Sequence, residues 1–491
     1  MRDIERYRNL TPTLFKRRGG FEREVTKKKN MKENNIPRRD FLKKLGFGIA
    51  ATTIATTGCD NKKNPVVKEH IANGELPKGK MTYRTNPNTG DKVSLLGYGC
   101  MRWPTLQDSE GKSTGEIDQE EVNRLVDKAI EYGVNYFDTA PVYCRGLSER
   151  ATGIALKRHP RDKYFIATKL SNFNRNAHSR EGAMQMYRNS FKELQVDYID
   201  YLLLHSLGGG GVENYENRYV KNGMIDFLME ERKAGRIRNL GFSYHGDKEM
   251  FDYLMSLHEK IHWDFVQIQL NYVDWKYSRG ASAEYQYTEL EKRGIPVVIM
   301  EPLLGGRLSK VHDHVAEKLK TRAPESSIAS WAFRFAGTWP GVLSVLSGMV
   351  YMEHLEDNIR TYSPLKPLSD DEKDFLEETA QLMQKYPTIP CNDCQYCMPC
   401  PYGLDIPAIL LHYNKCINEG MMPTSSQDPI YKEARQAFLV GYDRSVPKLR
   451  QADHCIGCRK CVPLCPQKIK IHREMEKINT FVETLKQNKE F

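Results

Sequence analysis

The sequence NYFDTAPVY, residues 135–143, decides the fold of the middle of this chain. It has the pattern of an apolar strand that ends in a turn, with Asp138 at the strand tip and Tyr143 in the loop. An amphipathic helix is predicted just before it, because apolar residues recur there at helical spacing and Gly133 follows them. These apolar residues are Val122, Leu125, Val126, Ala129 and Ile130.

Two later strand-like runs also end in a polar residue. YFIATK ends in Lys169, and YIDYLLLH ends in His205. In a parallel barrel the C-terminal ends of the strands share one face, which is where catalytic residues are found. A single polar group of this kind is usually a paired structural residue, but four in this order favour one shared site.

Strand-like runs alternate with amphipathic helices through the middle of the chain. The strands are expected at 93–99, 134–138, 164–168, 198–204, 237–243, 265–271, 296–300 and 341–348, and helices among others at 148–159, 224–235, 325–337 and 352–360. This alternation predicts a TIM (β/α)8 barrel over residues 81–365. A doubly wound sheet would need a glycine-rich dinucleotide loop after an early strand, and Gly208–Gly211 lacks that fingerprint.

The same residues resemble those of the aldo/keto reductases. The resemblance rests on Asp138-x4-Tyr143, on Lys169 and on His205, and it continues in LGFSYHG (240–246), VQIQLNY (266–272) and MEPLLGGRL (300–308). It spans residues 81–365. It implies an oxidoreductase that transfers a hydride between a nicotinamide cofactor, NAD(P), and a small-molecule carbonyl or alcohol.

The resemblance also implies a catalytic role for each polar group. Tyr143 would give a proton to the carbonyl oxygen, although a free tyrosine with a pKa near ~10 is a poor acid at neutral pH. Lys169 is expected to lower that pKa, and Asp138 to hold Lys169 in its charged form. His205 would orient the carbonyl or assist the proton transfer.

Further residues are assigned to cofactor binding by the same resemblance. They are Ser243 and Gln267 for the nicotinamide carboxamide, Pro302, Leu303, Gly306 and Arg307 for the pyrophosphate, and Asn358 for the adenine. Met300 stands where the family usually has an aromatic residue stacked on the nicotinamide. No Lys or Arg follows the last strand in residues 347–358, so the choice between NADH and NADPH stays open.

The C-terminal region holds two dense cysteine runs, which indicate metal ligation more than a disulfide framework. They are Cys391, Cys394, Cys397 and Cys400, and Cys455, Cys458, Cys461 and Cys465. The second run has the C-x2-C-x2-C-x3-C-P spacing of bacterial ferredoxins, which hold [4Fe–4S] clusters. The sequence therefore predicts two clusters in a small α-rich, ferredoxin-like domain over residues 391–491, joined to the barrel by a linker helix in residues 366–390.

In two-cluster ferredoxins the fourth cysteine of each run serves the other cluster. That rule pairs the first three cysteines of each run with Cys465 and Cys400, respectively. The first run has two residues before Cys400 where three are usual, so its assignment is the less secure one. Zinc is the alternative, since paired CxxC motifs also bind zinc.

The N-terminal region resembles an export signal. Residues 1–58 contain Arg38 and Arg39 in RRDFLKK, then an apolar run and Gly58-Cys59, a pattern similar to a twin-arginine signal with a lipoprotein site. We therefore expect export by the twin-arginine route to the periplasmic face of the envelope, with a lipid anchor at Cys59 and a tether over residues 59–80. Translation from Met31 stays open, and so does an accidental arginine pair in a disordered tail.

Charge argues against a nucleic-acid partner. Residues 1–58 hold 15 Lys and Arg against 6 Asp and Glu, which accounts for nine of the ten net positive charges of the 491-residue chain. The leading hypothesis is an exported oxidoreductase whose iron–sulfur domain serves electron transfer, with a redox partner protein left open, or structural support. The alternative is an iron–sulfur electron-transfer protein whose barrel is a binding module.

Overall fold

The computed structural model describes residues 74–487 apart from 110–112, 279, 387 and 424. All of these residues belong to one compact unit of the chain. The arginine pair, Cys59 and most of the expected tether lie outside them. Within the described part, none of the helices combines the length and apolar character needed to cross a bilayer.

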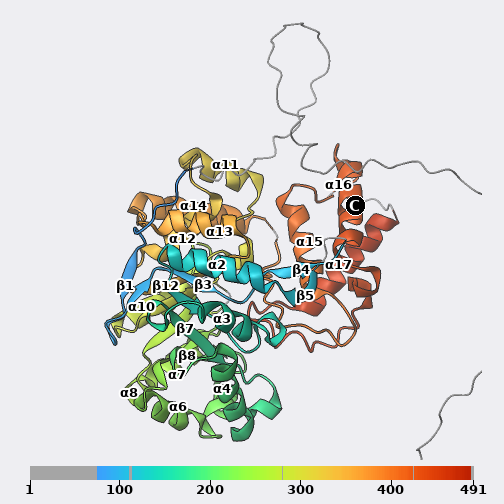
Figure 1. Ribbon diagram of the computed structural model, residues 1–491. Helices are drawn as coiled ribbons and strands as arrows, with labels where there is room; N and C mark the ends of the chain where they lie inside the picture. Colours follow the sequence, from blue (N-terminus) through green and yellow to red (C-terminus); the bar gives the residue numbers. More distant parts are fainter. Residues whose placement is uncertain (1–73, 110–112, 279, 387, 424, 488–491) are drawn as a thin grey trace, which may run out of the picture. The chain divides into compact units, whose positions relative to one another are not determined.

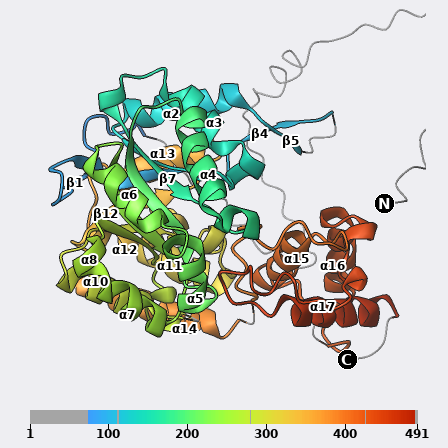
Figure 2. The same cartoon turned by 90° about the horizontal axis from the view of Figure 1, so that it is seen from below.

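A closed parallel barrel forms the middle of the described chain, in the strand order β10-β11-β12-β3-β6-β7-β8-β9 (Figures 1 and 2). Its strands are β3 Leu96–Gly99, β6 Tyr136–Asp138, β7 Phe165–Leu170, β8 Ile199–Leu207, β9 Ile237–Tyr244, β10 Phe265–Gln269, β11 Val297–Met300 and β12 Val342–Ser347. All of them overlap the predicted runs, so the barrel prediction is confirmed. The first predicted run is split, because Leu95 separates the barrel strand β3 from β2, Lys92–Ser94.

Helices cover the outside of this barrel (Figure 2). They are α2 Gln119–Glu131, α3 Ser148–Leu156, α4 Arg180–Leu194, α5 Gly211–Tyr215, α6 Met224–Lys233, α7 Lys248–Ser256, α8 His258–Ile261, α9 Asp274–Tyr277, α10 Ala283–Lys292, α11 Asp313–Arg322, α12 Ile328–Thr338, α13 Met352–Tyr362 and α14 Asp370–Gln384. Helix α2 begins where the Asp118 carboxylate accepts a hydrogen bond from the Glu121 amide. It buries the apolar stripe that the sequence predicted.

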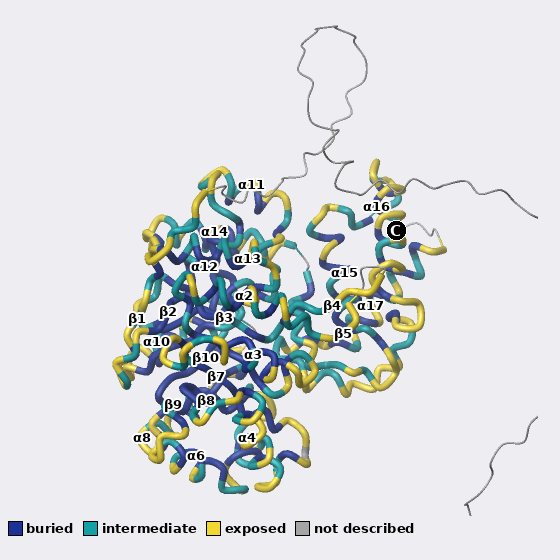
Figure 3. Tube along the Cα trace, in the orientation of Figure 1, coloured by how far each residue is buried: buried dark blue, intermediate teal, exposed yellow. Residues whose placement is uncertain are grey.

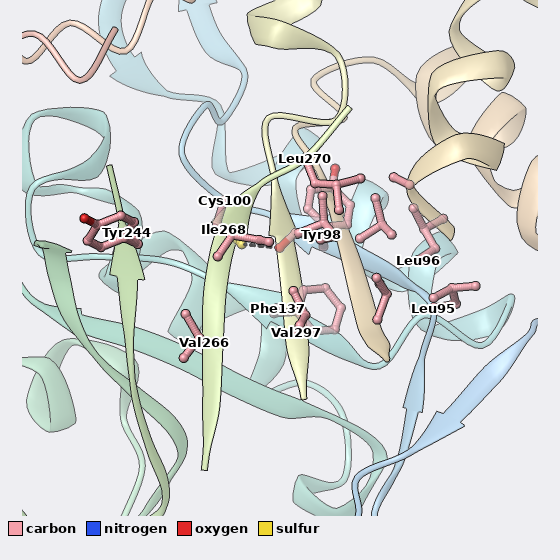
Figure 4. Close-up of a cluster of buried hydrophobic side chains, with 14 of the residues drawn as sticks. Leu95, Leu96, Tyr98, Cys100, Phe137, Tyr244, Val266, Ile268, Leu270 and Val297 are labelled. Carbon is pink, nitrogen blue, oxygen red and sulfur yellow. Dashed lines mark hydrogen bonds between the residues drawn. The ribbon is translucent and has the colours of Figure 1, made fainter. Parts of the chain in front are cut away.

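Two apolar layers hold the barrel together. One fills its interior, and the other lies between strands and helices, where Tyr98 and Phe137 stack with their ring centroids 5.8 Å apart (Figure 4). The burial map shows the strands as the most buried part of the molecule (Figure 3). The hairpin of β1, Tyr83–Thr85, with β2 adds Val93 to the interior layer.

A second apolar core lies in the C-terminal region and is formed by helices. They are α15 Ile406–Asn418, α16 Tyr431–Ser445 and α17 Ile471–Lys486. The two cysteine runs lie outside these helices, in loops and turns. The segment is α-rich as predicted.

Helix α14 occupies most of the predicted linker. Ser369 caps it in a capping box with Glu372. The helix packs on the barrel: Leu376 and Ala380 belong to the barrel's apolar cluster, and the Phe375 ring lies 5.4 Å from that of Trp331. Residues 370–384 are therefore part of the barrel's outer layer.

Candidate active site

Asp138 and Lys169 form a buried ion pair at the ends of the neighbouring strands β6 and β7. The side chains are 4% and 1% exposed, and the Lys169 ammonium donates to the Asp138 carboxylate. It also donates to the Thr139 carbonyl over 2.8 Å. The second Asp138 oxygen accepts from the Gln267 amide at 3.0 Å, so the pair is fixed from three strands.

Tyr143 lies directly over this pair. It begins a 3-10 turn, Tyr143–Gly146, and the Lys169 ammonium nitrogen is 4.8 Å from its ring centroid. The Tyr143 and His205 rings meet edge to face, with centroids 5.7 Å apart. The structure therefore brings together all four side chains that the sequence selected.

Burial sets the protonation of the group. It lowers the pKa of His205 well below its usual value, and the Lys169 and Arg218 charges lower it further, so this imidazole is neutral. Burial also raises the pKa of Asp138 and lowers that of Lys169, while the attraction between the two opposes both shifts. Each charge thus favours the charged form of the other and offsets part of the cost of burial.

Lys169 does not bring the pKa of Tyr143 below its usual value in this arrangement. Burial raises the Tyr143 pKa well above its usual value, and Tyr396 and Asp138 raise it further. The Lys169 charge is largely balanced by Asp138, so desolvation dominates. Tyr143 is therefore a protonated phenol at neutral pH.

His205 is held at both ring nitrogens. The Ser171 hydroxyl lies 2.5 Å from Nδ1, and the Tyr396 hydroxyl lies 3.0 Å from Nε2. After burial, Tyr396 is the largest cause that raises the pKa of Tyr143. Tyr396 comes from the first cysteine run, between Cys394 and Cys397, and sequence reasoning missed it because no local pattern links that run to the barrel mouth.

Comparison with known proteins agrees with this geometry. The model of the aldo/keto reductase family matches residues 95–380, more than half of the chain. The chain belongs to the aldo/keto reductase family. It is thus an enzyme, an oxidoreductase of the NAD(P)-dependent aldo/keto reductase type. The family match ends before the first cysteine run begins at Cys391.

Individual relatives cover the same part of this aldo/keto reductase. L-galactose dehydrogenase of Arabidopsis thaliana is 25% identical over 319 residues, which cover 62% of this chain and 95% of that protein. The uncharacterized oxidoreductase YqkF of Bacillus subtilis is 25% identical over 323 residues, with 60% and 95% covered. The holo form of the aldo-keto reductase AKR11C1 from Bacillus halodurans superposes with a TM-score of 0.49 at 23% identity, covering 61% and 96%.

The residues assigned to the nicotinamide lie at the ends of β9 and β10 and are buried. The Ser243 hydroxyl accepts a hydrogen bond from the Ser206 amide at 2.8 Å, and the Gln267 side-chain amide donates one to Asp138. Asn358, assigned to the adenine, donates to the Ser347 hydroxyl at 2.9 Å. Each of these side chains thus has a partner from this chain.

The loop assigned to the pyrophosphate contacts the C-terminal region. Pro302 is buried, and Leu303 and Gly306 are half-buried. Arg307 donates to the Thr388 hydroxyl at 2.9 Å. A cavity of about 160 Å³ lies beside this loop, and its lining contains none of the four catalytic candidates. It is lined among others by Tyr244, His245, Gln269, Arg307, Thr388, Gln467 and Lys468.

Glu301 is a half-buried group that was not selected from the sequence. Burial raises its pKa to about 7, and Arg102 opposes the rise. It follows β11 directly, so the argument from strand-end polar residues that selected His205 would have found it. Its charge acts on both Tyr143 and Tyr396, which places it beside the catalytic group.

The thiols of the two cysteine runs influence one another across the runs. Burial raises the pKa of Cys391 to about 11 and also raises the pKa of Cys394 and Cys397; Cys465 adds to each rise, and Cys461 adds to that of Cys397. The Cys461 pKa, also about 11, is raised by burial and then by the neighbours Cys455, Cys458 and Cys400. In the described part of the chain, no three His, Cys, Asp or Glu side chains are arranged as a metal site.

Proposed function

We propose that this aldo/keto reductase transfers a hydride between a nicotinamide dinucleotide and a small-molecule carbonyl or alcohol. The observation that carries the proposal is the gathering of Asp138, Tyr143, Lys169 and His205 at the C-terminal ends of the barrel strands. Sugars are one substrate class to test, because one relative is an L-galactose dehydrogenase.

The chain's own residues support the reduction of a carbonyl. The bound nicotinamide supplies the hydride to the carbonyl carbon, and the developing alkoxide needs a proton. Tyr143, which burial keeps protonated, gives that proton to the oxygen. Neutral His205 donates a hydrogen bond to the same oxygen from Nε2, while Ser171 fixes the ring at Nδ1.

The residues at the ends of β9 and β10 fit a carboxamide. Ser243 has a hydroxyl proton to donate, and the Gln267 carbonyl oxygen is not used in the bond to Asp138. A carboxamide offers one acceptor and two donors, which these two groups complement. Arg307 supplies a positive charge beside the pyrophosphate loop.

The test is reductase activity on a panel of aldehydes, ketones and sugars with NADH and NADPH. Tyr143→Phe removes the proton donor, so turnover should fall by about 100-fold or more. Tyr277→Phe, at a 39% exposed site on α9, serves as the matched control. Equal function of the Tyr143 variant and the original protein would favour the alternative, an electron-transfer protein whose barrel only binds.

We propose further that the two cysteine runs hold two [4Fe–4S] clusters. Cys391, Cys394, Cys397 and Cys465 would ligate one, and Cys455, Cys458, Cys461 and Cys400 the other. Cys465 acts on all three leading thiols of the first run, and Cys400 acts on Cys461 of the second, which supports the crossed pairing of ferredoxin-type runs. The clusters would exchange single electrons with a redox partner protein or stabilise the C-terminal region.

Anaerobic purification followed by iron, sulfide and zinc analysis tests this assignment. Cys458→Ser should remove about half of the iron, because one of two clusters loses a ligand. Cys416→Ser is the control, since Cys416 is a buried packing residue of α15 outside both runs. Zinc in place of iron and sulfide would contradict the proposal.

We also propose export by the twin-arginine route with lipidation at Cys59. This route carries folded proteins, which suits a chain that acquires clusters before export. Replacing Arg38 and Arg39 by Lys should retain the protein in the cytoplasm, and Cys59→Ala should release it from the membrane fraction. The proposal would be contradicted if cell fractionation found both variants in the same fraction as the original protein.

A further inference from the structure

The hydroxyl of Tyr396 lies in the position that a reacting carbonyl oxygen requires. It is 3.0 Å from His205 Nε2, and the Tyr396 and Tyr143 rings both meet the His205 ring edge to face, with centroids 6.0 and 5.7 Å from it. The proposed reduction needs the substrate oxygen within hydrogen-bond distance of both His205 Nε2 and the Tyr143 hydroxyl. Two oxygen atoms cannot occupy that point together, so the phenol excludes the substrate.

The ring of Tyr396 is packed against the same pocket. Its centroid lies 6.0 Å from that of His205 and 5.7 Å from that of Phe173. The Arg218 guanidinium lies 5.0 Å from the Phe173 ring and donates to the His205 carbonyl over 2.6 Å. Aromatic contacts and hydrogen bonds thus hold the phenol in one orientation.

The backbone next to Tyr396 is tied to barrel loops. We call residues 388–397 the plug segment. Arg102, after β3, donates to the carbonyls of Asn392 and Asp393 at 2.7 and 2.8 Å. Gly305 has φ +68°, and a Cβ there would lie 2.3 Å from the Asn392 carbonyl oxygen, so only glycine allows this approach.

We propose that the plug segment is an internal inhibitor: Tyr396 occupies the carbonyl-oxygen subsite, and a substrate reacts only after the phenol has withdrawn. The proposal deepens the proposed reductase function and rests on it. Cys394 and Cys397 flank Tyr396, so the segment that blocks the barrel is also the segment proposed to ligate a cluster.

The first measurement is reductase turnover of 4-nitrobenzaldehyde by the full chain. Tyr396→Ala should raise kcat/KM by about tenfold or more, because the aldehyde no longer competes with a tethered phenol held by hydrogen bonds. Added p-cresol should refill the vacated space and inhibit Tyr396→Ala competitively, at concentrations that leave the original protein unaffected. Tyr402→Ala, at a 45% exposed site beyond the same cysteine run, should behave like the original protein.

The second measurement is calorimetric binding of p-cresol without cofactor or turnover. Tyr396→Ala should bind p-cresol, the original protein should not, and adding His205→Ala should abolish the binding. If this binding pattern is found but the protein has no reductase activity, the plug is supported and the proposed function is contradicted. Unchanged or lower kcat/KM in Tyr396→Ala, with equal p-cresol binding in both proteins, would overturn the plug. A lower kcat in Tyr396→Phe at unchanged KM would also overturn it, because the phenol would then assist turnover.

Discussion

The barrel strand ends and the plug segment bring groups to the same site by different physical means. Asp138 and Lys169 lie together because β6 and β7 pair in parallel, and the pairing of Asp138 with Ala167 sets their spacing. Tyr396 reaches His205 across 191 residues of sequence, through contacts that no strand register dictates. A site formed by regular strand pairing can be predicted from the sequence, whereas a tertiary contact made by a loop cannot.

The largest expected effect tests the barrel side of this comparison. Lys169→Met leaves the buried Asp138 carboxylate without its partner, so the free energy of unfolding should fall by about 3–5 kcal/mol. Reductase turnover should be lost as well. Urea denaturation measures the stability, and adding Asp138→Asn should recover part of it because no unpaired charge remains.

Lys276→Met supplies the matched control for Lys169. Lys276 pairs with Glu377 on α14, and both side chains are over a third exposed. Solvent screens such pairs, so the expected loss is about 0–1 kcal/mol. Equal losses at Lys276 and Lys169 would contradict the buried character of the catalytic pair.

The sequence predicted most of the barrel, and it selected the four side chains that the structure brings together, for one reason. Strand periodicity and polar strand ends are local signals, and residues such as His205 carry both. It did not predict the Tyr143 pKa, because burial outweighs Lys169 only once Tyr396 and the surrounding chain exclude water. Leu376 and Ala380 show the same limit: their helix was recognised, but its packing on the barrel depends on distant residues.

The second prediction concerns a buried carboxyl behind the catalytic lysine. Glu149 on α3 accepts a hydrogen bond from the Thr168 hydroxyl at 2.6 Å, and burial raises its pKa from 4.5 to about 7. Glu193 adds to the rise, and Lys169 opposes it. Between pH 4.5 and 7 the folded chain holds a proton that the unfolded chain has lost, so stability falls as pH increases.

Glu149→Gln cannot titrate and keeps the acceptor for Thr168. The stability of this variant should not show the decrease with pH that Glu149 causes. The difference in the free energy of unfolding between the variant and the original protein should therefore change by about 3 kcal/mol between pH 4.5 and 7.5. Urea denaturation across that range provides the measurement. Parallel stability curves for the two proteins would show that the Glu149 carboxyl is not buried as described.

The third prediction loosens the plug segment without touching Tyr396. Arg102→Met removes both hydrogen bonds to the Asn392 and Asp393 carbonyls, each worth about 1.5–3 kcal/mol when the donor is charged. Amide hydrogen exchange in residues 391–397 should accelerate at least tenfold. Arg124→Met, at an exposed site on α2, should leave this exchange unchanged. Equal protection in the Arg102 variant and the original protein would show that Arg102 does not anchor the plug segment.

The smallest effect decides to which region α14 belongs. Ser369→Ala removes the capping hydroxyl that accepts from the Glu372 amide, which should cost about 1 kcal/mol. Because Leu376 and Ala380 are in the barrel's apolar cluster, the loss should appear in the unfolding of the barrel. Amide hydrogen exchange in β7 and β8 measures the stability of the barrel, and exchange in α15 and α17 measures that of the C-terminal core. If only the C-terminal core loses protection, α14 is the linker that the sequence indicated. If the barrel strands lose protection, α14 belongs to the barrel because its apolar side chains pack there.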